Sequence, residues 1–278
     1  MARVDLIVRG GGIFGLSIAW AAARRGAKVR LIETQRIGAG SSGGVVGALS
    51  PHVPENWNAK KAFQLQSLLM AQSWWQAVES AAALPTGYAR SGRLQPLADA
   101  AAVELAQKRA ATARDLWQGQ AEWRLIPATG GAWEPASPSG WLVHDSLSAR
   151  LHPRMAAAAL VAAIRAKGGE VIIGDGADEG PVVWASGLAG LQALSDDLGR
   201  TVGDGVKGQA LLLRHAAETL PQLFVAGLHI IPHADATVAI GSTSEHQWSD
   251  PTSTDDQLAA LYSAAIAALP VLAGAEVI

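Results

Sequence analysis

Residues 4–33, VDLIVRGGGIFGLSIAWAAARRGAKVRLIE, decide the predicted fold. The apolar start is typical of a short buried strand, and it is followed by a Gly-rich turn and by a helical stretch that Gly26 ends. Residues 28–32 then indicate a second strand. A strand, a Gly-rich turn, a helix and a strand within about thirty residues open a doubly wound α/β domain. We therefore predict an α/β protein that begins with a Rossmann-like domain.

Three glycines in this stretch have the spacing G-x-G-x-x-G: Gly10, Gly12 and Gly15. The first permits a tight turn out of the strand, the second lets the backbone approach a pyrophosphate, and the third lets the helix lie close to the strand. The pyrophosphate would meet free N–H groups at the positive end of the helix. The alternative is a Gly-rich turn that binds nothing.

The second strand ends at Glu33, eighteen residues after Gly15. A carboxylate there can accept a hydrogen bond from a ribose 2′-hydroxyl, and its charge disfavours the 2′-phosphate of NADP. The spacing alone does not separate FAD from NAD. Arg9 is unexpected at the end of a parallel strand, where burial of an unpaired charge is costly. We expect Arg9 to reach solvent, to pair with a carboxylate, or to weaken the site.

The rest of the chain indicates two discontinuous domains. Seven of the ten tryptophans lie between Trp57 and Trp141, so this stretch differs in composition from the N-terminus. We predict an FAD/NAD-binding Rossmann-like domain of residues 1–53 and 141–200 and an α+β substrate domain of residues 54–140 and 201–278. Within the second domain we expect helices at 59–80, 99–119 and 255–269, and extended chain at 88–97. The stretches GQALLLR, LFVAGLHIIPH and TVAIGSTSE are typical of strands.

Composition excludes several other classes of protein. The 278 residues are 49% hydrophobic and 17% charged, with a net charge of −2 and no cysteine. This excludes a disulfide scaffold and a Cys-ligated metal, and we expect no metal site because the seven histidines lack a ligand spacing. Without a basic patch we expect no nucleic-acid partner. No stretch is apolar enough to span a membrane, and no signal peptide is evident, so we expect a cytoplasmic protein.

Several stretches together resemble a known family. They are the segment from Val8 to Glu33, GAGSSGGVVGALSPH at 38–52, LHPRMAAAALVAAIRAKGGEVIIGDG at 151–176, PVVWASG at 181–187, KGQALLLR at 207–214 and HIIPHADATVAIGSTSE at 229–245. In this order they resemble the D-amino-acid oxidase and glycine oxidase superfamily of FAD-dependent oxidoreductases. Each motif is weak alone, but the ordered set covers most of the chain.

The resemblance implies FAD as the cofactor and assigns contacts along it. The glycine turn would hold the pyrophosphate and Glu33 the adenosine ribose, while two serines of the second Gly-rich loop would line the diphosphate. Small residues near 48 would make room for the isoalloxazine ring, and the WASG turn would close over the dinucleotide. The alternative for the two serines is a solvated loop. The predicted cofactor residues are Gly10, Gly12, Ile13, Phe14, Gly15, Glu33, Thr34, Ser41, Ser42, Gly47, Ala48, Leu49, Ala185, Ser186 and Gly187.

Four residues are candidates for contact with the substrate. His229 and His233 occupy positions where members of this family often carry a tyrosine and an arginine that line the substrate pocket. Strand alternation would place both on one face; alternatively they are hydrogen-bonded strand residues without a role. His52 could lie near the flavin edge or be an ordinary loop residue. Arg93 could clamp a carboxylate through its guanidinium fork, although a solvated arginine is the more common outcome.

The resemblance also implies a function. We expect an FAD-dependent oxidoreductase that oxidises the C–N bond of glycine, a D-amino acid or a sarcosine-like amine to an imine, with a small amino acid or amine as its partner. Members of the family continue past the position of Ile278 with a G-x-R-P stretch and a last helix. We therefore expect a C-terminally truncated chain with weak or absent FAD retention and low activity.

Three other functions stay open. The first is a flavin-binding subunit without catalysis of its own, which would have a partner chain or form a homo-oligomer. The second is the related oxidoreductase that cleaves a carboxymethyl amine on tRNA, which GALSP resembles. The third is an NAD-linked dehydrogenase.

Overall fold

The computed structural model describes residues 4–278, which divide into two units. The first unit contains the segment that ends at Gly44, together with Trp74–Thr86 and Pro153–Val206. The second contains Val45–Ser73, Gly87–His152 and Lys207–Ile278. Residues 141–152 lie in the second unit, whereas the sequence predicted them in the Rossmann-like domain, because the strand over 141–145 pairs with strands of the second unit. The units also differ from the predicted domains at residues 45–53, which lie in the second unit, and at 74–86 and 201–206, which lie in the first. The assignment of the two domains to cofactor and substrate stays a prediction.

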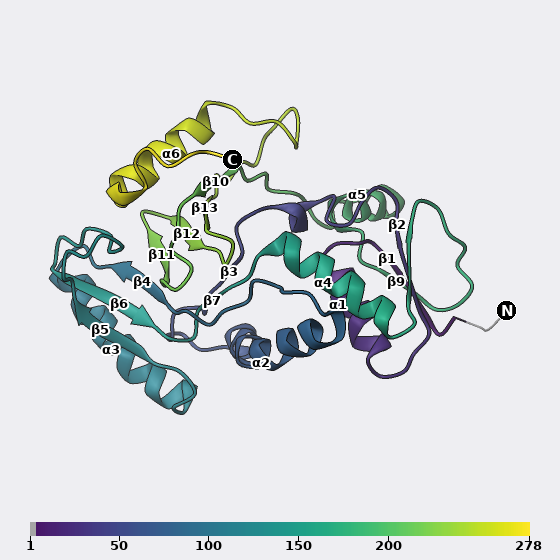
Figure 1. Cartoon of the computed structure of the whole chain (residues 1–278), viewed down its shortest axis with the longest axis horizontal. Helices are drawn as coiled ribbons and strands as arrows, with labels where there is room; N and C mark the ends of the chain where they lie inside the picture. The colour runs from purple at the N-terminus through teal and green to yellow at the C-terminus, as the bar shows by residue number, and fades with distance from the viewer. Residues whose placement is uncertain (1–3) are drawn as a thin grey trace. The chain divides into compact units, whose positions relative to one another are not determined.

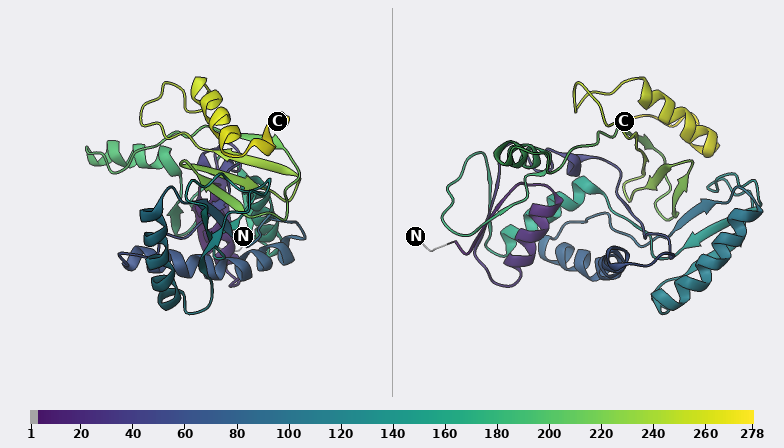
Figure 2. Two further views of the ribbon diagram at one scale, coloured as in Figure 1. Left: turned by 90° about the vertical axis from the view of Figure 1, so that its left-hand side faces the viewer. Right: turned by 180° about the vertical axis from the view of Figure 1, so that it is seen from behind.

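The first unit is built on a four-stranded sheet in which every neighbouring pair is parallel. The strand order is β8 (Glu170–Ile173), β2 (Val29–Glu33), β1 (Leu6–Arg9) and β9 (Val182–Trp184). Helices α1 (Ile13–Ala23) and α4 (Pro153–Ala166) lie side by side in this unit (Figures 1 and 2). Ile7 and Leu31 of the central strands are fully buried, as a parallel sheet requires. The α/β, Rossmann-like prediction is confirmed by this topology.

Three further elements flank this sheet or link the units. Helix α5 (Gly187–Leu198) follows β9, and a 3₁₀ turn η1 (Ser41–Gly43) lies in the second Gly-rich loop. Helix α2 (Ala59–Ala82) belongs to the second unit up to Ser73 and to the first unit from Trp74.

The second unit contains a seven-stranded, mostly antiparallel sheet and a two-stranded ladder. The ladder joins β3 (Ala48–Leu49) to β7 (Ala149–Arg150). The large sheet has the order β10 (Ala210–Arg214), β13 (Thr237–Gly241), β12 (Leu228–Pro232), β11 (Gln222–Val225), β4 (Arg93–Pro96), β6 (Trp141–Asp145) and β5 (Trp123–Pro127).

Helices of the second unit cover opposite faces of this sheet. Helix α6 (Asp256–Ala268), which leads into the 3₁₀ turn η2 (Pro270–Leu272), packs on the face that carries Leu223 and Ile230. Helix α3 (Ala100–Trp117) packs against Trp123 and Val143. The register pairs Gln95 with Val143, so both residues lie on the side of the sheet that α3 covers at one end of the sheet. Arg93 is two residues before Gln95 on β4 and therefore lies on the same side. Figure 1 shows α6 and α3 at different ends of the sheet.

The register gathers polar and aromatic residues on that side, which we call the Arg93 face. Arg93 pairs with Asp145 on β6 and with Gln222 on β11, and Phe224 pairs with His229 on β12. Because paired residues point to the same side of a sheet, the Arg93 face comprises Arg93, Asp145, Gln222, Phe224 and His229.

One expected strand is a hairpin. The stretch LFVAGLHIIPH forms β11 and β12, which a turn at Ala226 and Gly227 separates. Both turn residues have positive φ angles, 51° and 80°. Within residues 4–278, no helix combines the length and the apolar character that a membrane crossing needs.

Candidate functional site

The glycine turn after β1 has the geometry that its spacing predicts. Gly10 has a φ of +116°, and a Cβ there would overlap the carbonyl of Ala185. A Cβ at Gly15 would overlap the Gly10 carbonyl, so only glycine lets α1 lie this close to the strand end. A Cβ at Gly12 would lie 3.2 Å from the Ser42 hydroxyl, in the space in front of the helix. Glycine at positions 10 and 15 therefore permits close backbone packing around the turn, and glycine at position 12 avoids crowding Ser42.

This N-terminus offers unpaired donors. Ile13 N–H donates to Ser42 Oγ at 2.9 Å, and Leu16 N–H donates to the Gly12 carbonyl. Within residues 4–278, the N–H groups of Gly12, Phe14 and Gly15 have no acceptor. Such groups at the positive end of a helix bind phosphate oxygens. The Phe14 side chain is 79% exposed and projects away from the core.

Glu33 is fixed by two backbone N–H groups at the end of β2. It ends β2 and is buried, and its Oε2 accepts from Gly11 N–H at 2.7 Å while Oε1 accepts from Gln35 N–H at 2.8 Å. Each carboxylate oxygen has a further lone pair for a hydroxyl donor. The next residue, Thr34, is exposed.

The second Gly-rich loop is folded back on itself and lies beside the turn. Ser42 faces α1 through its bond to Ile13, whereas Ser41 is exposed. Two arginines that the sequence analysis did not single out hold the loop. Arg36 Nη1 donates to the Gly38 carbonyl at 3.3 Å, and Arg154 Nε donates to the Gly43 carbonyl at 2.9 Å. For Arg154, the sequence offers one clue to this role. The residue lies in LHPRM, at the start of a predicted helix.

The WASG turn closes the same edge of the sheet. Ala185 N–H donates to the Arg9 carbonyl at 2.7 Å, and Gly187 has a φ of +60° at the start of α5. The Arg9 side chain leaves the turn open, because its guanidinium pairs with Asp178 at 2.8 Å and with the Gly176 carbonyl at 2.7 Å. Of the outcomes expected for Arg9, pairing with a carboxylate is the one observed.

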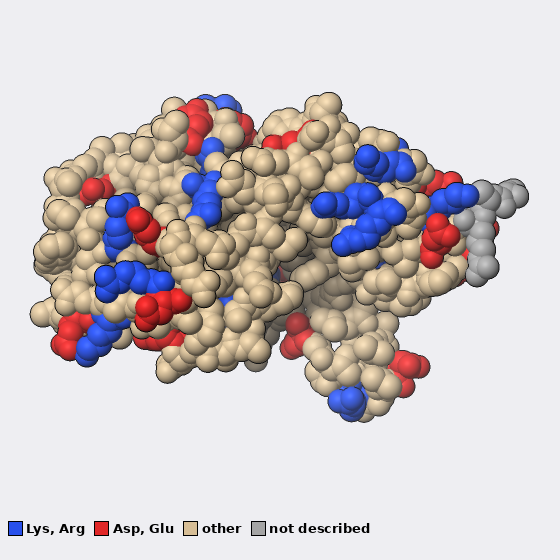
Figure 3. Space-filling view, turned by 90° about the horizontal axis from the view of Figure 1, so that it is seen from below, with Lys and Arg blue, Asp and Glu red and all other residues tan. Residues whose placement is uncertain are grey.

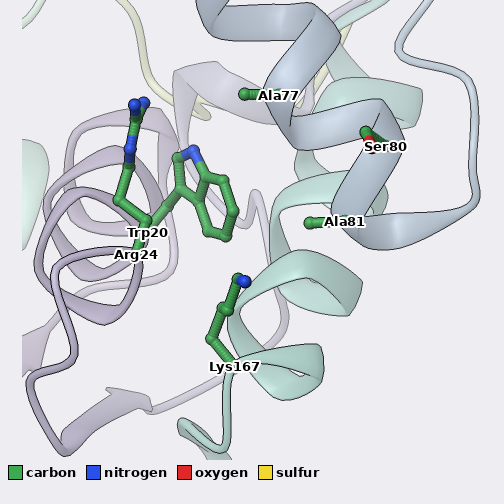
Figure 4. A pocket seen from close by; sticks show the side chains of 6 residues that line it. All are labelled: Trp20, Arg24, Ala77, Ser80, Ala81 and Lys167. Carbon is green, nitrogen blue, oxygen red and sulfur yellow. The ribbon is translucent and has the colours of Figure 1, made fainter.

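A separate pocket of about 410 Å³ lies at the other end of α1. It is lined by Trp20, Arg24, Ala77, Ser80, Ala81 and Lys167 (Figure 4). Arg24 caps the C-terminus of α1 and lies over the rings of Trp20 and Trp74, and Lys167 directly follows α4. Cations at helix C-termini stabilise the helix dipole, which accounts for both residues. Figure 3 shows a group of Lys and Arg side chains over this part of the first unit.

The second unit holds the segment that was expected beside the isoalloxazine ring. Gly47 accepts from Leu151 N–H at 2.9 Å, and Ala48 and Leu49 pair with β7. These three residues are half-buried and carry small or apolar side chains. Gln222 Nε2 donates to the Leu49 carbonyl at 3.2 Å and so ties this segment to the Arg93 face.

Arg93 is buried on the Arg93 face. It is therefore not the solvated arginine that is the more common outcome. Its Nε donates to Asp145 Oδ2 at 3.0 Å, and its guanidinium lies 5.8 Å from the centre of the Phe224 ring. Asp145 is fully buried and also accepts from Ser148 N–H at 2.7 Å. Nη1 and Nη2 of Arg93 form no hydrogen bond within residues 4–278, and both reach accessible space.

His229 lies next to this pair on β12. Its ring is 4.8 Å from that of Phe224, and its Nδ1 is enclosed without a partner among the described residues. Burial lowers the pKa of His229, and the nearby Arg93 charge lowers it further. The imidazole is therefore neutral at pH 7. His52 is half-buried, and its backbone N–H donates to Gln64 Oε1 at 2.7 Å.

His233 follows β12 and is fully buried in a cluster of its own. Its Nε2 is 2.9 Å from the Val45 carbonyl, and its ring centre is 4.6 Å from that of His152. His152 Nε2 lies 3.6 Å from Asp235. Burial lowers the pKa of His233 to about 4. This geometry favours a role in holding the chain at Val45 over direct contact with a substrate.

The two units therefore carry different chemistry. The first offers unpaired amide donors, a hydroxyl and a fixed carboxylate, which fit the pyrophosphate and ribose of an adenine dinucleotide. The second offers a guanidinium, a neutral imidazole and an aromatic ring on one sheet face. Within residues 4–278, no group of three His, Cys, Asp or Glu residues could hold a metal ion.

The chain is similar to several curated proteins over part of their length. A glycine oxidase from Pseudomonas putida is 41% identical over 92 residues, which are 31% of this chain and 25% of that protein. The bifunctional protein ThiO/ThiG from Nostoc is 25% identical over 96% of this chain and 44% of its own length. The chain thus spans less than half the length of these curated relatives.

A solved structure shows the same fold. The glycine oxidase from Geobacillus kaustophilus superposes with a TM-score of 0.81 at 19% identity, covering all of this chain and 81% of that one. At this identity the likeness establishes the fold alone. The model of the FAD-dependent oxidoreductase family DAO matches residues 5–278. The resemblance seen in the sequence is confirmed, and the chain belongs to the DAO family of FAD-dependent oxidoreductases.

Proposed function

We propose that this chain binds FAD and oxidises the C–N bond of a small amino acid or secondary amine, such as glycine, a D-amino acid or sarcosine, to the imine. The observation that carries the proposal is the N-terminus of α1, where three amide groups have no acceptor within residues 4–278 and a Cβ at Gly12 would crowd the Ser42 hydroxyl. Glu33 adds a fixed acceptor for a ribose hydroxyl.

FAD, when bound, supplies the electron acceptor for the pair of electrons that leaves the substrate C–N unit. The chain itself has to bind the cofactor, orient the substrate and keep the reacting amine neutral. A neutral His229 can accept a hydrogen bond from the amine without adding a positive charge beside it. Gly47, Ala48 and Leu49, which are half-buried, are the residues proposed to lie beside the flat ring, and His52 stays a proposed member of the same site. His233 is proposed to hold the chain at Val45 and not to contact the substrate.

Binding of FAD to the 278-residue chain tests the first half of the proposal. We expect FAD to bind with quenching of its fluorescence, and Gly12→Ala to raise its dissociation constant roughly 10- to 100-fold, because the added methyl occupies the phosphate side of the turn. Gly40→Ala is the matched control. Gly40 lies in the neighbouring loop, and a Cβ there meets nothing within 4 Å.

Anaerobic addition of glycine, sarcosine or D-alanine to the FAD-loaded chain tests the second half. Bleaching of the oxidised-flavin absorbance supports the proposed oxidation. If FAD binds and none of these amines bleaches it, the activity is wrong and the chain is a flavin-binding subunit. If the wild-type chain binds no FAD, or if Gly12→Ala binds as tightly as Gly40→Ala, the proposed cofactor site is wrong.

A further inference from the structure

We infer that the pocket at the C-terminal end of α1 binds a small linear dicarboxylate, with one carboxylate on Arg24 and the other on Lys167. The inference goes beyond the proposed function and does not depend on it. All residues that line the pocket belong to the first unit, and none of them is part of the glycine turn at the other end of α1. The pocket volume of about 410 Å³ lies within the range of sites for small organic ligands.

The two positive charges of the pocket have no counter-charge. Arg24 and Lys167 line it, and within residues 4–278 their side-chain N–H groups have no acceptor. Arg9 and Arg30 of the same unit instead pair with carboxylates. Among the described residues, no Asp or Glu lines the pocket. Helix ends explain why cations stand at these two positions, but they do not explain a cavity in which every charged group is positive.

Arg24 is held so that one edge of its guanidinium stays free. The guanidinium carbon lies 6.0 Å from the centre of the Trp20 ring and 5.6 Å from that of the Trp74 ring. Such contacts attract the cation to the ring faces without using its in-plane N–H groups. A guanidinium presents these N–H groups as a planar fork that matches both oxygens of a carboxylate. Arg24 is therefore oriented for one end of an anionic ligand before the ligand arrives.

The pocket has apolar surface between its two charges. Figure 4 shows the Trp20 ring between the side chains of Arg24 and Lys167. Ala77 and Ala81 of α2 add small apolar side chains to the lining. A ligand with an anionic group at each end and methylene groups between them matches this order. A single carboxylate would meet one cation and leave the other unpaired, so the pocket favours a dicarboxylate over a monocarboxylate.

The helix C-termini at the pocket limit the affinity without reversing this preference. Each contributes at most about half a negative charge, whereas each cation contributes a full positive one. Terminal carbonyls are also occupied, since the Ala22 carbonyl accepts from Arg25 N–H and the Ile164 carbonyl accepts from Gly169 N–H. Both cations are exposed, and exposed ion pairs contribute modestly and are screened by salt. We therefore expect a dissociation constant in the millimolar range at low ionic strength.

Glutarate and valerate test the pocket, because the two acids have the same number of carbon atoms and differ by one carboxylate. We titrate each acid into the full chain at low ionic strength, with and without added FAD, and follow binding by saturation-transfer NMR. We expect glutarate to bind about fivefold more tightly than valerate, which corresponds to the gain of one exposed ion pair. FAD should leave this ratio unchanged, since the glycine turn lies at the opposite end of α1.

Two matched pairs of variants assign the preference to the pocket. Arg24→Gln and Lys167→Gln should each reduce the ratio of glutarate affinity to valerate affinity to about one, because the second carboxylate loses its partner. The controls Arg25→Gln and Arg165→Gln remove the same charge from neighbouring residues that do not line the pocket and whose guanidinium groups bond to backbone carbonyls. We expect both controls to keep the wild-type ratio. Because the ratio is measured within one variant, a partial loss of folding affects both acids alike.

Ala81→Leu tests the position of the ligand without changing any charge. The larger side chain occupies part of the pocket, so we expect both acids to bind roughly threefold or more weakly. A wild-type ratio near one, or a ratio that Arg24→Gln and Lys167→Gln leave unchanged, would overturn the inference. An equal fall of the ratio in all four charge variants would indicate a diffuse surface effect and would overturn it as well. Unchanged glutarate binding in Ala81→Leu would place the ligand outside the pocket, with the same consequence.

Discussion

The His233 imidazole lies where its charged form is disfavoured. It is fully buried, its Nδ1 has no partner among the described residues, and its Nε2 bonds to the Val45 carbonyl. The charged or titratable groups that face it are His152, Arg150 and Asp235. Burial is the largest effect and lowers the pKa of His233 from 6.5 to about 4.

This shift makes stability depend on pH in a defined direction. Between pH 6.5 and about 4 the unfolded chain binds more protons at residue 233 than the folded chain does, so stability falls as the pH falls through this window. The loss at pH 4.5 is on the order of 2–3 kcal/mol. His233→Gln can keep the bond to Val45 and cannot titrate. We expect urea midpoints at pH 4.5 and 7.5 to differ less in this variant than in the wild type. Equal differences in the two proteins would contradict the assigned pKa.

Single residues differ in how far the sequence predicts them. The roles of Gly10 and Gly15 follow from local backbone geometry, so the G-x-G-x-x-G spacing is sufficient to predict them. The partner of Arg93 is 52 residues away in the sequence, on another strand. No local pattern predicts that pairing, and the sequence alone therefore does not show that Arg93 is buried.

At the scale of elements, several helices were predicted close to their observed bounds, whereas helix α5, strand β5 and one turn were missed. The helix expected at 99–119 is observed at Ala100–Trp117, because Asp99 caps it by accepting from Ala102 N–H. The β11–β12 turn escaped notice because its residues are Ala226 and Gly227, and not the Asn-Gly or Asp-Gly pair that marks a two-residue hairpin. An alanine in the left-handed region is costly, and the sequence gives no sign of it.

The same turn allows a stabilising substitution. Asn tolerates the left-handed conformation better than Ala does, so we expect Ala226→Asn to stabilise the chain by about 0.5–1 kcal/mol. Gly227→Ala should destabilise it by about 1 kcal/mol, since φ at residue 227 is +80°. Urea midpoints measure both effects. The control Ala216→Asn, at an exposed loop position, should leave the midpoint unchanged; a similar gain there would show that the turn is not the cause.

At the scale of the whole molecule, the division into units depends on pairings between distant segments. The stretch 141–152 precedes α4 of the first unit, and sequence order alone favours grouping it with α4. Its strand β6 instead pairs with β4 and β5 of the second unit. A helix that contributes to both units, as α2 does, leaves no linker whose composition could mark a boundary.

The molecule also leaves apolar surface uncovered on α5. None of the residues of this helix is buried, and Leu194 and Leu198, one turn apart, are 46% and 49% exposed. These two side chains bury little apolar surface. We therefore expect the double substitution of Leu194 and Leu198 by Gln to change the free energy of unfolding by less than about 0.5 kcal/mol. We also expect the double variant to bind less of the dye ANS. Leu160→Ala, at a fully buried position of α4, is the contrasting variant and should cost about 2–5 kcal/mol in the same urea titration. A loss above about 1 kcal/mol in the α5 variant, or unchanged ANS fluorescence, would mean that these leucines are covered in solution.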